Sequence, residues 1–205
     1  QPEEIMQDFL DIMNANMGFF QSIATVVSGI VGLGLIIIII KAKKSAAIKD
    51  YLGLNKIGWK VALLSIGLMV VYNLAVSGIQ ILLGNQAGDE QSLIKIYETA
   101  VSRPLFWISV VIFAPLFEEA IFRGFLFEGF RQSKLGIWWT IIITAATWAV
   151  LHAFQYQVFN VLVILVLGLI MGVVRWRTKT IWSTFIMHAT MNLWAVIALE
   201  LTINA

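Results

Sequence analysis

Residues 105–129 read LFWISVVIFAPLFEEAIFRGFLFEG and place two adjacent carboxylates, Glu118 and Glu119, inside a predominantly apolar stretch. A helix needs roughly 20 predominantly apolar residues to cross a bilayer, and this stretch is long enough to do so. Ionisable side chains within a span are energetically costly and usually serve a function. The stretch therefore predicts both a membrane helix and a buried chemical site.

The rest of the chain has the same apolar character. Of its 205 residues, 60% are hydrophobic and only 13% are charged, whereas an ordinary soluble domain carries about 25% charged residues. Too few polar side chains are present to cover a water-facing surface, so most of the protein is expected to lie in lipid. The predicted fold is all-α, a polytopic bundle of about six transmembrane helices: Phe19–Ile40, Trp59–Leu83, Leu105–Gly129, Ile137–Phe154, Val158–Val174 and Ile181–Leu201.

We expect one transmembrane domain over residues 19–205, with the residues that carry chemistry in a core at 100–200. The preceding segment, residues 1–18, is acidic and lacks the basic flank of a signal peptide. Ile5, Phe9, Ile12 and Met13 fall on one face of a helix there, which predicts an amphipathic segment lying along the outer membrane surface. Cysteine is absent, which excludes disulfides, thiolate metal sites and a cysteine nucleophile.

Basic residues predict the orientation of the bundle. Only Lys95 and Arg103 fall on one side of the predicted spans, and the other twelve of the 14 lysines and arginines fall on the opposite side. By the positive-inside rule the richer side is cytoplasmic, so both termini are predicted to be outside. The expected location is the plasma membrane. The twelve are Lys41, Lys43, Lys44, Lys49, Lys56, Lys60, Arg123, Arg131, Lys134, Arg175, Arg177 and Lys179.

Several ionisable side chains fall at similar depths in the predicted spans. The only two histidines, His152 and His188, both lie in spans. At 1.5 Å per residue they lie roughly 22 and 10 Å from the cytoplasmic ends of their spans, against roughly 16 Å for Glu118. Boundary shifts of a few residues would place all three in one layer. Glu119 and Arg123 are four residues apart, a spacing that favours an ion pair. Glu118 points about 100° away around the helix and has no local basic partner. It is therefore the candidate general base of a site nearer the cytoplasmic side.

Proline is expected to disturb the helix next to this carboxylate. Pro115 has no N–H, so it cannot donate a hydrogen bond to the carbonyl of Val111. A kink at this point would open space for water beside Glu118.

Two further side chains suit the stabilisation of a reaction intermediate. His188 and Asn192 are four residues apart on one helical face, and both can donate hydrogen bonds to an oxyanion. Trp148 precedes His152 by one helical turn and is predicted to pack against the imidazole or to line the cavity.

These residues form three ordered motifs that resemble the CPBP family, which comprises CAAX proteases and bacteriocin-processing (self-immunity) membrane proteins. The family carries EExxxR, FxxxH and HxxxN or HxxxD on successive core helices. The resemblance covers about residues 100–200. The chain differs from the family pattern by a tryptophan in place of phenylalanine, and it has six predicted spans where some relatives have eight. The matching positions are Glu118, Glu119 and Arg123, then Trp148 and His152, then His188 and Asn192.

The resemblance implies an intramembrane endopeptidase that acts on a peptide or membrane-protein substrate. Glu118 and His152 would activate a water for attack on a peptide carbonyl. His188 and Asn192 would stabilise the oxyanion, and the predicted ion pair would hold the helix and the general base in place. The sequence has no readable prenyl pocket, so the substrate and its prenylation stay open.

The sequence alone leaves the metal dependence open. Family members have been regarded as metal-dependent, and Glu118, His152 and His188 offer the carboxylate and two imidazoles of a catalytic zinc site, with water as a fourth ligand. No HExxH helix supports that assignment. Catalysis without a cofactor is the favoured hypothesis, with zinc as the alternative.

Two other classes of function remain as alternatives. A non-proteolytic immunity or scaffold protein would use the same fold to bind a membrane-protein partner. A small transporter or proton relay would use buried glutamate and histidine, although the chain shows no inverted repeat. No nucleic-acid partner is expected.

Overall fold

The computed structural model describes residues 2–43, 46–84 and 90–204, and every regular element in these ranges is a helix. The prediction of an all-α bundle is therefore confirmed. Lys44, which entered the charge pattern, lies outside the described residues.

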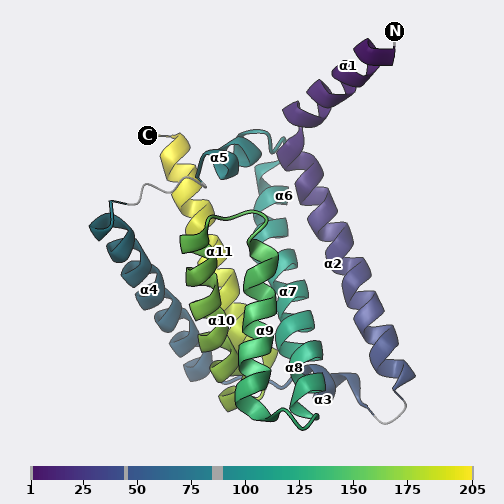
Figure 1. Ribbon diagram of the computed structural model, residues 1–205, viewed down its shortest axis with the longest axis vertical. Coiled ribbons are helices and arrows are strands. Elements are labelled where there is room, and N and C mark those ends of the chain that lie inside the picture. Colours follow the sequence, from purple (N-terminus) through teal and green to yellow (C-terminus); the bar gives the residue numbers. More distant parts are fainter. Residues whose placement is uncertain (1, 44–45, 85–89, 205) are drawn as a thin grey trace.

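Six membrane helices form the bundle, and their ends lie within a few residues of the predicted ones (Figure 1). Five are long and apolar enough to cross a membrane, and α9 is a shorter apolar helix of 17 residues. Both chain ends lie at the same end of the bundle, as an even number of crossings requires (Figure 1). The six are α2 (Met17–Ala42), α4 (Trp59–Leu82), a composite helix over Arg103–Arg131, α9 (Gly136–His152), α10 (Val158–Thr178) and α11 (Ile181–Ile203).

The composite third span contains two π-helical segments within an otherwise α-helical course. It runs through α6 (Arg103–Ile108), the π-helical η1 (Ser109–Phe113), α7 (Ala114–Glu119), the π-helical η2 (Ala120–Leu126) and α8 (Phe127–Arg131). Such π-helical segments are rare and are frequently found at functional sites. The two carboxylates therefore sit at the end of the short α-helical stretch between the two π segments.

The π register corrects the predicted effect of Pro115. The N–H of Ala114 donates to the carbonyl of Ser109, five residues back. The next bond in that register would join Pro115 to Val110, not Val111, and proline has no hydrogen to donate. Asn192 supplies the missing donor, because its Nδ2 lies 2.8 Å from the carbonyl oxygen of Val110.

Close helix packing holds the site residues of α9 in place. Gly168 and Gly172 of α10 face α9, and a Cβ added at Gly168 would lie 3.1 Å from that of Ala145. At Gly172 it would lie 2.8 Å from the Ile141 side chain. Small residues at these positions allow the two backbones to approach, which fixes α9 as one wall of the site.

The amphipathic segment forms the separate helix α1 (Pro2–Ala15), which diverges from the bundle (Figure 1). The predicted apolar face does not pack on the protein, since Ile5, Phe9 and Ile12 are 70%, 56% and 59% exposed. Its placement on the outer membrane surface stays a prediction.

The connection between α4 and α6 contains a short helix that the sequence did not indicate, α5 (Glu90–Glu98). Tyr97 of this helix is buried, bonds to the Glu200 carboxylate and accepts a hydrogen bond of 2.9 Å from Trp107 Nε1. Arg103 pairs with the same carboxylate at 2.7 Å. These contacts tie α5 to the start of α6 and the end of α11.

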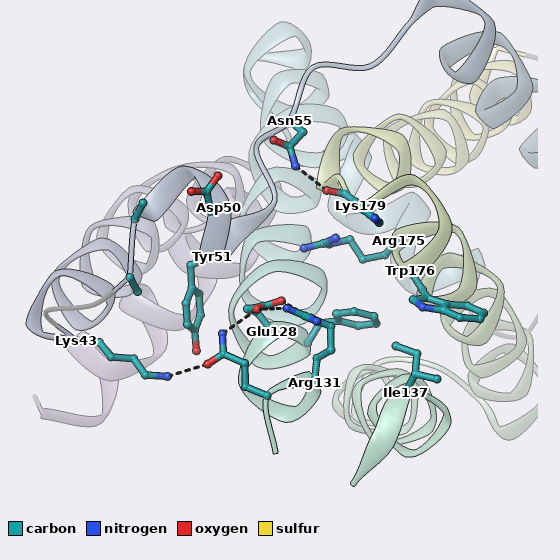
Figure 2. Close-up of a pocket in the computed structure, with 14 residues that line it drawn as sticks. Lys43, Asp50, Tyr51, Asn55, Glu128, Arg131, Ile137, Arg175, Trp176 and Lys179 are labelled. Atoms are coloured by element: carbon teal, nitrogen blue, oxygen red, sulfur yellow. Dashed lines mark hydrogen bonds and ion pairs between the residues drawn. The ribbon is translucent and has the colours of Figure 1, made fainter. Parts of the chain in front are cut away.

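At the opposite end, α3 (Ile48–Leu52) and the residues after it contact the turn between α10 and α11. The carbonyl of Gly53 accepts from the N–H of Ile181 at 3.0 Å. Asn55 donates to the carbonyl of Lys179 at 3.0 Å (Figure 2) and accepts from Thr180 Oγ1 at 2.7 Å. This end of the bundle is therefore closed by the connection between α2 and α4.

Candidate active site

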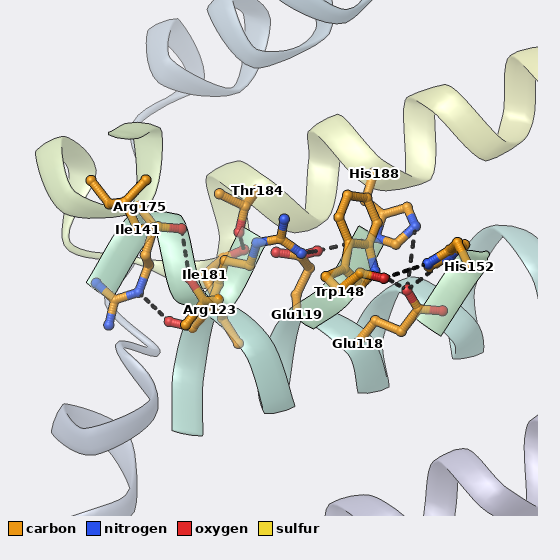
Figure 3. Close-up of polar contacts among 11 residues, drawn as sticks. Glu118, Glu119, Arg123, Ile141, Trp148, His152, Arg175, Ile181, Thr184 and His188 are labelled. Atoms are coloured by element: carbon orange, nitrogen blue, oxygen red, sulfur yellow. Dashed lines mark hydrogen bonds and ion pairs between the residues drawn. The ribbon is translucent and has the colours of Figure 1, made fainter. Parts of the chain in front are cut away.

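Glu118, His152 and His188 meet inside the bundle, each carried by a different helix: α7, α9 and α11 (Figure 3). The Glu118 Oε2 atom lies 4.0 Å from His152 Nε2 and 3.9 Å from His188 Nε2. Helical residues separated by up to 70 positions in the sequence thus converge on one carboxylate oxygen.

Trp148 sits at the centre of this group. Its Nε1–H donates a hydrogen bond of 2.6 Å to Glu118 Oε2. Its ring makes edge-to-face contacts with both imidazoles, at centroid distances of 5.1 Å to His152 and 5.2 Å to His188. The indole therefore orients the carboxylate and separates the two histidines.

Glu119 faces the interior of the protein instead. It pairs with Arg123 at 3.1 Å, and both side chains are fully buried. The same Oε1 atom lies 3.0 Å from His188 Nδ1, and the Arg123 guanidinium lies 4.3 Å from the centroid of the Trp148 ring. The ion pair thus contacts two residues that border Glu118.

The hydrogen-bond partners of the two histidines define their tautomers. His152 Nδ1 lies 2.8 Å from the carbonyl oxygen of Trp148, and His188 Nδ1 lies 3.0 Å from the Glu119 carboxylate. Both partners are acceptors, so Nδ1 carries the hydrogen and Nε2 of a neutral ring presents a lone pair. Both lone pairs face the Glu118 carboxylate. Three hydrogen-bond acceptors therefore face one another, the Glu118 oxygen and the two Nε2 atoms. Such an arrangement requires a proton, a water or a cation between them.

Two cavities border this group on opposite sides of Trp148 and His152. One, of ≈360 Å³, is lined by residues of α2, the third span and α9, including Glu118 and Phe117. The other, of ≈380 Å³, lies among α4, α10 and α11 and includes His188 and Asn192 in its lining. The side chains of Glu118 and His152 remain 24% and 20% exposed. Glu118 is accessible from the first cavity, and His152 lines both.

Asn192 has a structural contact that the sequence did not reveal. Its Nδ2 bonds to the carbonyl of Val110 across the interface between α11 and η1. A side-chain amide carries two hydrogens on this nitrogen, and Asn192 also lines the second cavity beside His188. The predicted role as an oxyanion donor therefore rests on the second hydrogen.

Asn73 and Tyr156 also line the second cavity and were missed in the sequence. Asn73, on α4, is 8% exposed and its buried Nδ2 has no hydrogen-bond partner among the described residues. Tyr156 follows α9 and stacks on His152 at a centroid distance of 6.0 Å. Asn73 could have been identified from the sequence, because it is a side-chain amide inside an apolar span. Tyr156 lies in a loop, where no sequence pattern marks it as part of the site.

Zinc matches the donor types of this group but not their spacing. Metal-to-ligand bonds of about 2.0–2.2 Å place the ligand atoms of a tetrahedral site roughly 3.4 Å apart. The Glu118 oxygen lies 3.9 and 4.0 Å from the two nitrogens, and no group of three His, Cys, Asp or Glu side chains in the described ranges is placed to hold a metal ion.

Two comparisons with known proteins found a match. Residues 100–194 match the family described as type II CAAX prenyl endopeptidase Rce1-like. The chain is also similar to the Bacillus subtilis (strain 168) protein named "Putative membrane peptidase YdiL", with 26% identity over 190 residues that cover 89% of this chain and 73% of that protein. No solved structure matches the chain.

Proposed function

Because the chain is a membrane protease of the CPBP family, we propose that it hydrolyses peptide bonds inside the membrane with a water activated by Glu118 and His152. The observation that carries the proposal is the gap of 4.0 Å between Glu118 Oε2 and His152 Nε2. A water about 2.8 Å from each atom fits such a gap and donates one hydrogen to each.

In the proposed reaction the water oxygen attacks the carbonyl carbon of the peptide while Glu118 accepts a proton. The carbonyl oxygen becomes the oxyanion of a tetrahedral intermediate. When the C–N bond breaks, the proton held by Glu118 passes to the leaving nitrogen. The products are a carboxylic acid and an amine, which together contain the atoms of the peptide and one water.

The proposed oxyanion site requires a particular protonation state of His188. His188 uses its Nδ1 hydrogen toward Glu119, so it donates to an oxyanion only when Nε2 also carries a hydrogen. The role therefore needs the imidazolium form, with Glu119 as its counter-charge. Asn192 would contribute its second amide hydrogen from the same helix.

We further propose that the protein lies in the plasma membrane with the α3 end of the bundle in the cytoplasm, as the basic residues indicate. Glu118 is then 13 residues from the cytoplasmic end of its span at Arg131 and 15 from the outer end at Arg103. The site would sit near the membrane centre, slightly toward the cytoplasm.

Purified full-length chain in liposomes tests the proposal against a library of peptides. Mass spectrometry should find pairs of internal fragments whose masses sum to that of the substrate plus one water. His152→Ala and His188→Ala should release neither fragment. Cleavage that persists unchanged in both variants would overturn the assignment, and metal analysis of the active preparation tests the zinc alternative directly.

Asn192 is expected to have separable structural and chemical roles. Asn192→Ala should destabilise the protein by about 1–3 kcal/mol, because the Val110 carbonyl loses its donor. Adding Pro115→Ala supplies a backbone N–H to the same carbonyl and should restore the unfolding temperature. If Asn192 also stabilises the oxyanion, turnover should stay roughly 10²–10³-fold below wild type. Activity that returns together with stability would assign Asn192 a structural role alone.

Asn73 is expected to bind a substrate carbonyl from the second cavity, because its buried amide nitrogen has no partner among the described residues. Asn73→Leu should leave the unfolding temperature unchanged or raise it, since no bond within the protein is lost. Loss of one hydrogen bond to substrate should lower kcat/KM roughly tenfold. Ser65→Ala on the same helix is the matched control, and equal kinetics in the two variants would contradict the assignment.

A further inference from the structure

A cavity of ≈800 Å³ lies at the α3 end of the bundle, between α3, α8 and the last turn of α10 (Figure 2). It is separate from the two cavities around Glu118. Three aromatic residues contribute to its lining, Tyr51, Phe127 and Trp176. Its charged lining residues are Lys43, Asp50, Glu128, Arg131, Arg175 and Lys179.

Arg175 is the central feature of this cavity. Its side chain is only 5% exposed, and its Nε donates a hydrogen bond of 2.8 Å to the carbonyl of Arg123. The two terminal nitrogens have no acceptor among the described residues, and Figure 2 shows the guanidinium reaching into the cavity. A buried cation with unused donors is costly unless an anion compensates it.

The backbone next to Arg175 is shaped around the guanidinium. Gly53 has φ +68°, and a Cβ at this position would lie 2.4 Å from Arg175 Nη2. A side chain is therefore excluded by both conformation and contact. The close approach holds the guanidinium plane in one position at the wall of the cavity.

The charges in the lining leave a positive excess. Glu128 Oε1 and Oε2 accept hydrogen bonds of 2.7 and 2.8 Å from Arg131, and Gln132 donates to Oε1 at 2.8 Å. This pairing neutralises Glu128 and Arg131. Three cations, Lys43, Arg175 and Lys179, then face the single carboxylate of Asp50.

We propose that this cavity binds the phosphate group of an anionic phospholipid from the cytoplasmic leaflet. The paired terminal nitrogens of Arg175 match two phosphate oxygens, and Lys179 adds a positive charge at the rim. Basic pockets between membrane helices on the cytoplasmic side suit such headgroups. The edge-to-face pair of Trp138 and Trp176, at 5.7 Å, places aromatic rings beside the opening, as expected at headgroup level.

Titration of lipid into the purified full-length chain in a nonionic detergent tests the proposal without any protease substrate. Phosphatidylglycerol should raise the unfolding temperature in a saturable way, and phosphatidylcholine should not. Lys179→Gln should weaken phosphatidylglycerol binding about fivefold, the loss expected for one cation near a headgroup. Arg175→Lys keeps the charge but loses the paired donors, and should weaken binding further.

Lys60→Gln removes a basic residue from the same side of the bundle but outside the cavity, and should bind like wild type. The proposal fails if Lys179→Gln and Lys60→Gln bind phosphatidylglycerol equally, or if phosphatidylcholine binds as tightly. Inorganic phosphate tests whether the cavity binds a free phosphate ion instead of the phosphate group of a lipid. Protection by phosphate equal to that by phosphatidylglycerol would assign the cavity to a free anion and overturn the lipid assignment. Since binding is measured without turnover, either result is independent of the proposed protease activity.

Discussion

Glu118→Gln is expected to reduce kcat/KM by roughly 10²–10⁴-fold, the usual contribution of a general base. Glutamine keeps the length of the side chain, and its amide oxygen can still accept the hydrogen bond that Trp148 Nε1 now makes at 2.6 Å. It cannot accept the proton of the attacking water. The unfolding temperature should therefore stay near that of wild type while turnover is lost.

Glu128→Gln is the matched control for this variant, because it removes a carboxylate from the same span outside both cavities that surround His152. Rates should be measured on one cleavable peptide at several concentrations, so that kcat and KM are separated. Wild-type turnover in Glu118→Gln would assign water activation to another group. Absence of cleavage by wild type, with full biological rescue by Glu118→Gln, would favour the non-proteolytic scaffold.

Arg123→Met is expected to be among the most destabilising substitutions in the protein, by about 3–5 kcal/mol. The substitution leaves the Glu119 carboxylate, which is fully buried, without its cation. It also removes the guanidinium that lies 4.3 Å from the Trp148 ring centroid. Thermal unfolding in detergent, followed by circular dichroism, measures the change.

The double variant Glu119→Leu/Arg123→Met tests the physical reason. The double variant no longer contains the buried Glu119 carboxylate that Arg123→Met leaves without a cation. Most of the lost stability should therefore return. Activity should not return, because His188 Nδ1 would have lost the acceptor that orients the ring. A double variant no more stable than Arg123→Met would show that packing, not charge, dominates at this position.

Apolar length and local spacing were sufficient to predict the spans and the Glu119–Arg123 pair. The predicted second span, Trp59–Leu83, and the observed helix, Trp59–Leu82, differ by one residue. Such features depend on residues that are neighbours along one helix. The sequence also placed Glu118 and the two histidines at compatible depths, which the structure brings together.

Contacts between distant segments could not be predicted in this way. The bond from Asn192 to Val110 joins residues 82 positions apart, and it accompanies the π register that moved the effect of Pro115 by one residue. The bond from Trp148 to Glu118 crosses 30 positions. Neither pairing has a local pattern, because each depends on how two helices are rotated against each other.

The shortness of α9 has a consequence for the lipid around it. Its 17 residues give a length of about 25 Å at 1.5 Å per residue, whereas the hydrocarbon core is about 30 Å thick. Such a hydrophobic mismatch is relieved when the bilayer thins locally. His152 ends this helix, so thinning would bring the lipid headgroups at that end closer to its imidazole. We therefore expect acyl-chain length in the surrounding membrane to affect how readily water reaches the group of Glu118, His152 and His188.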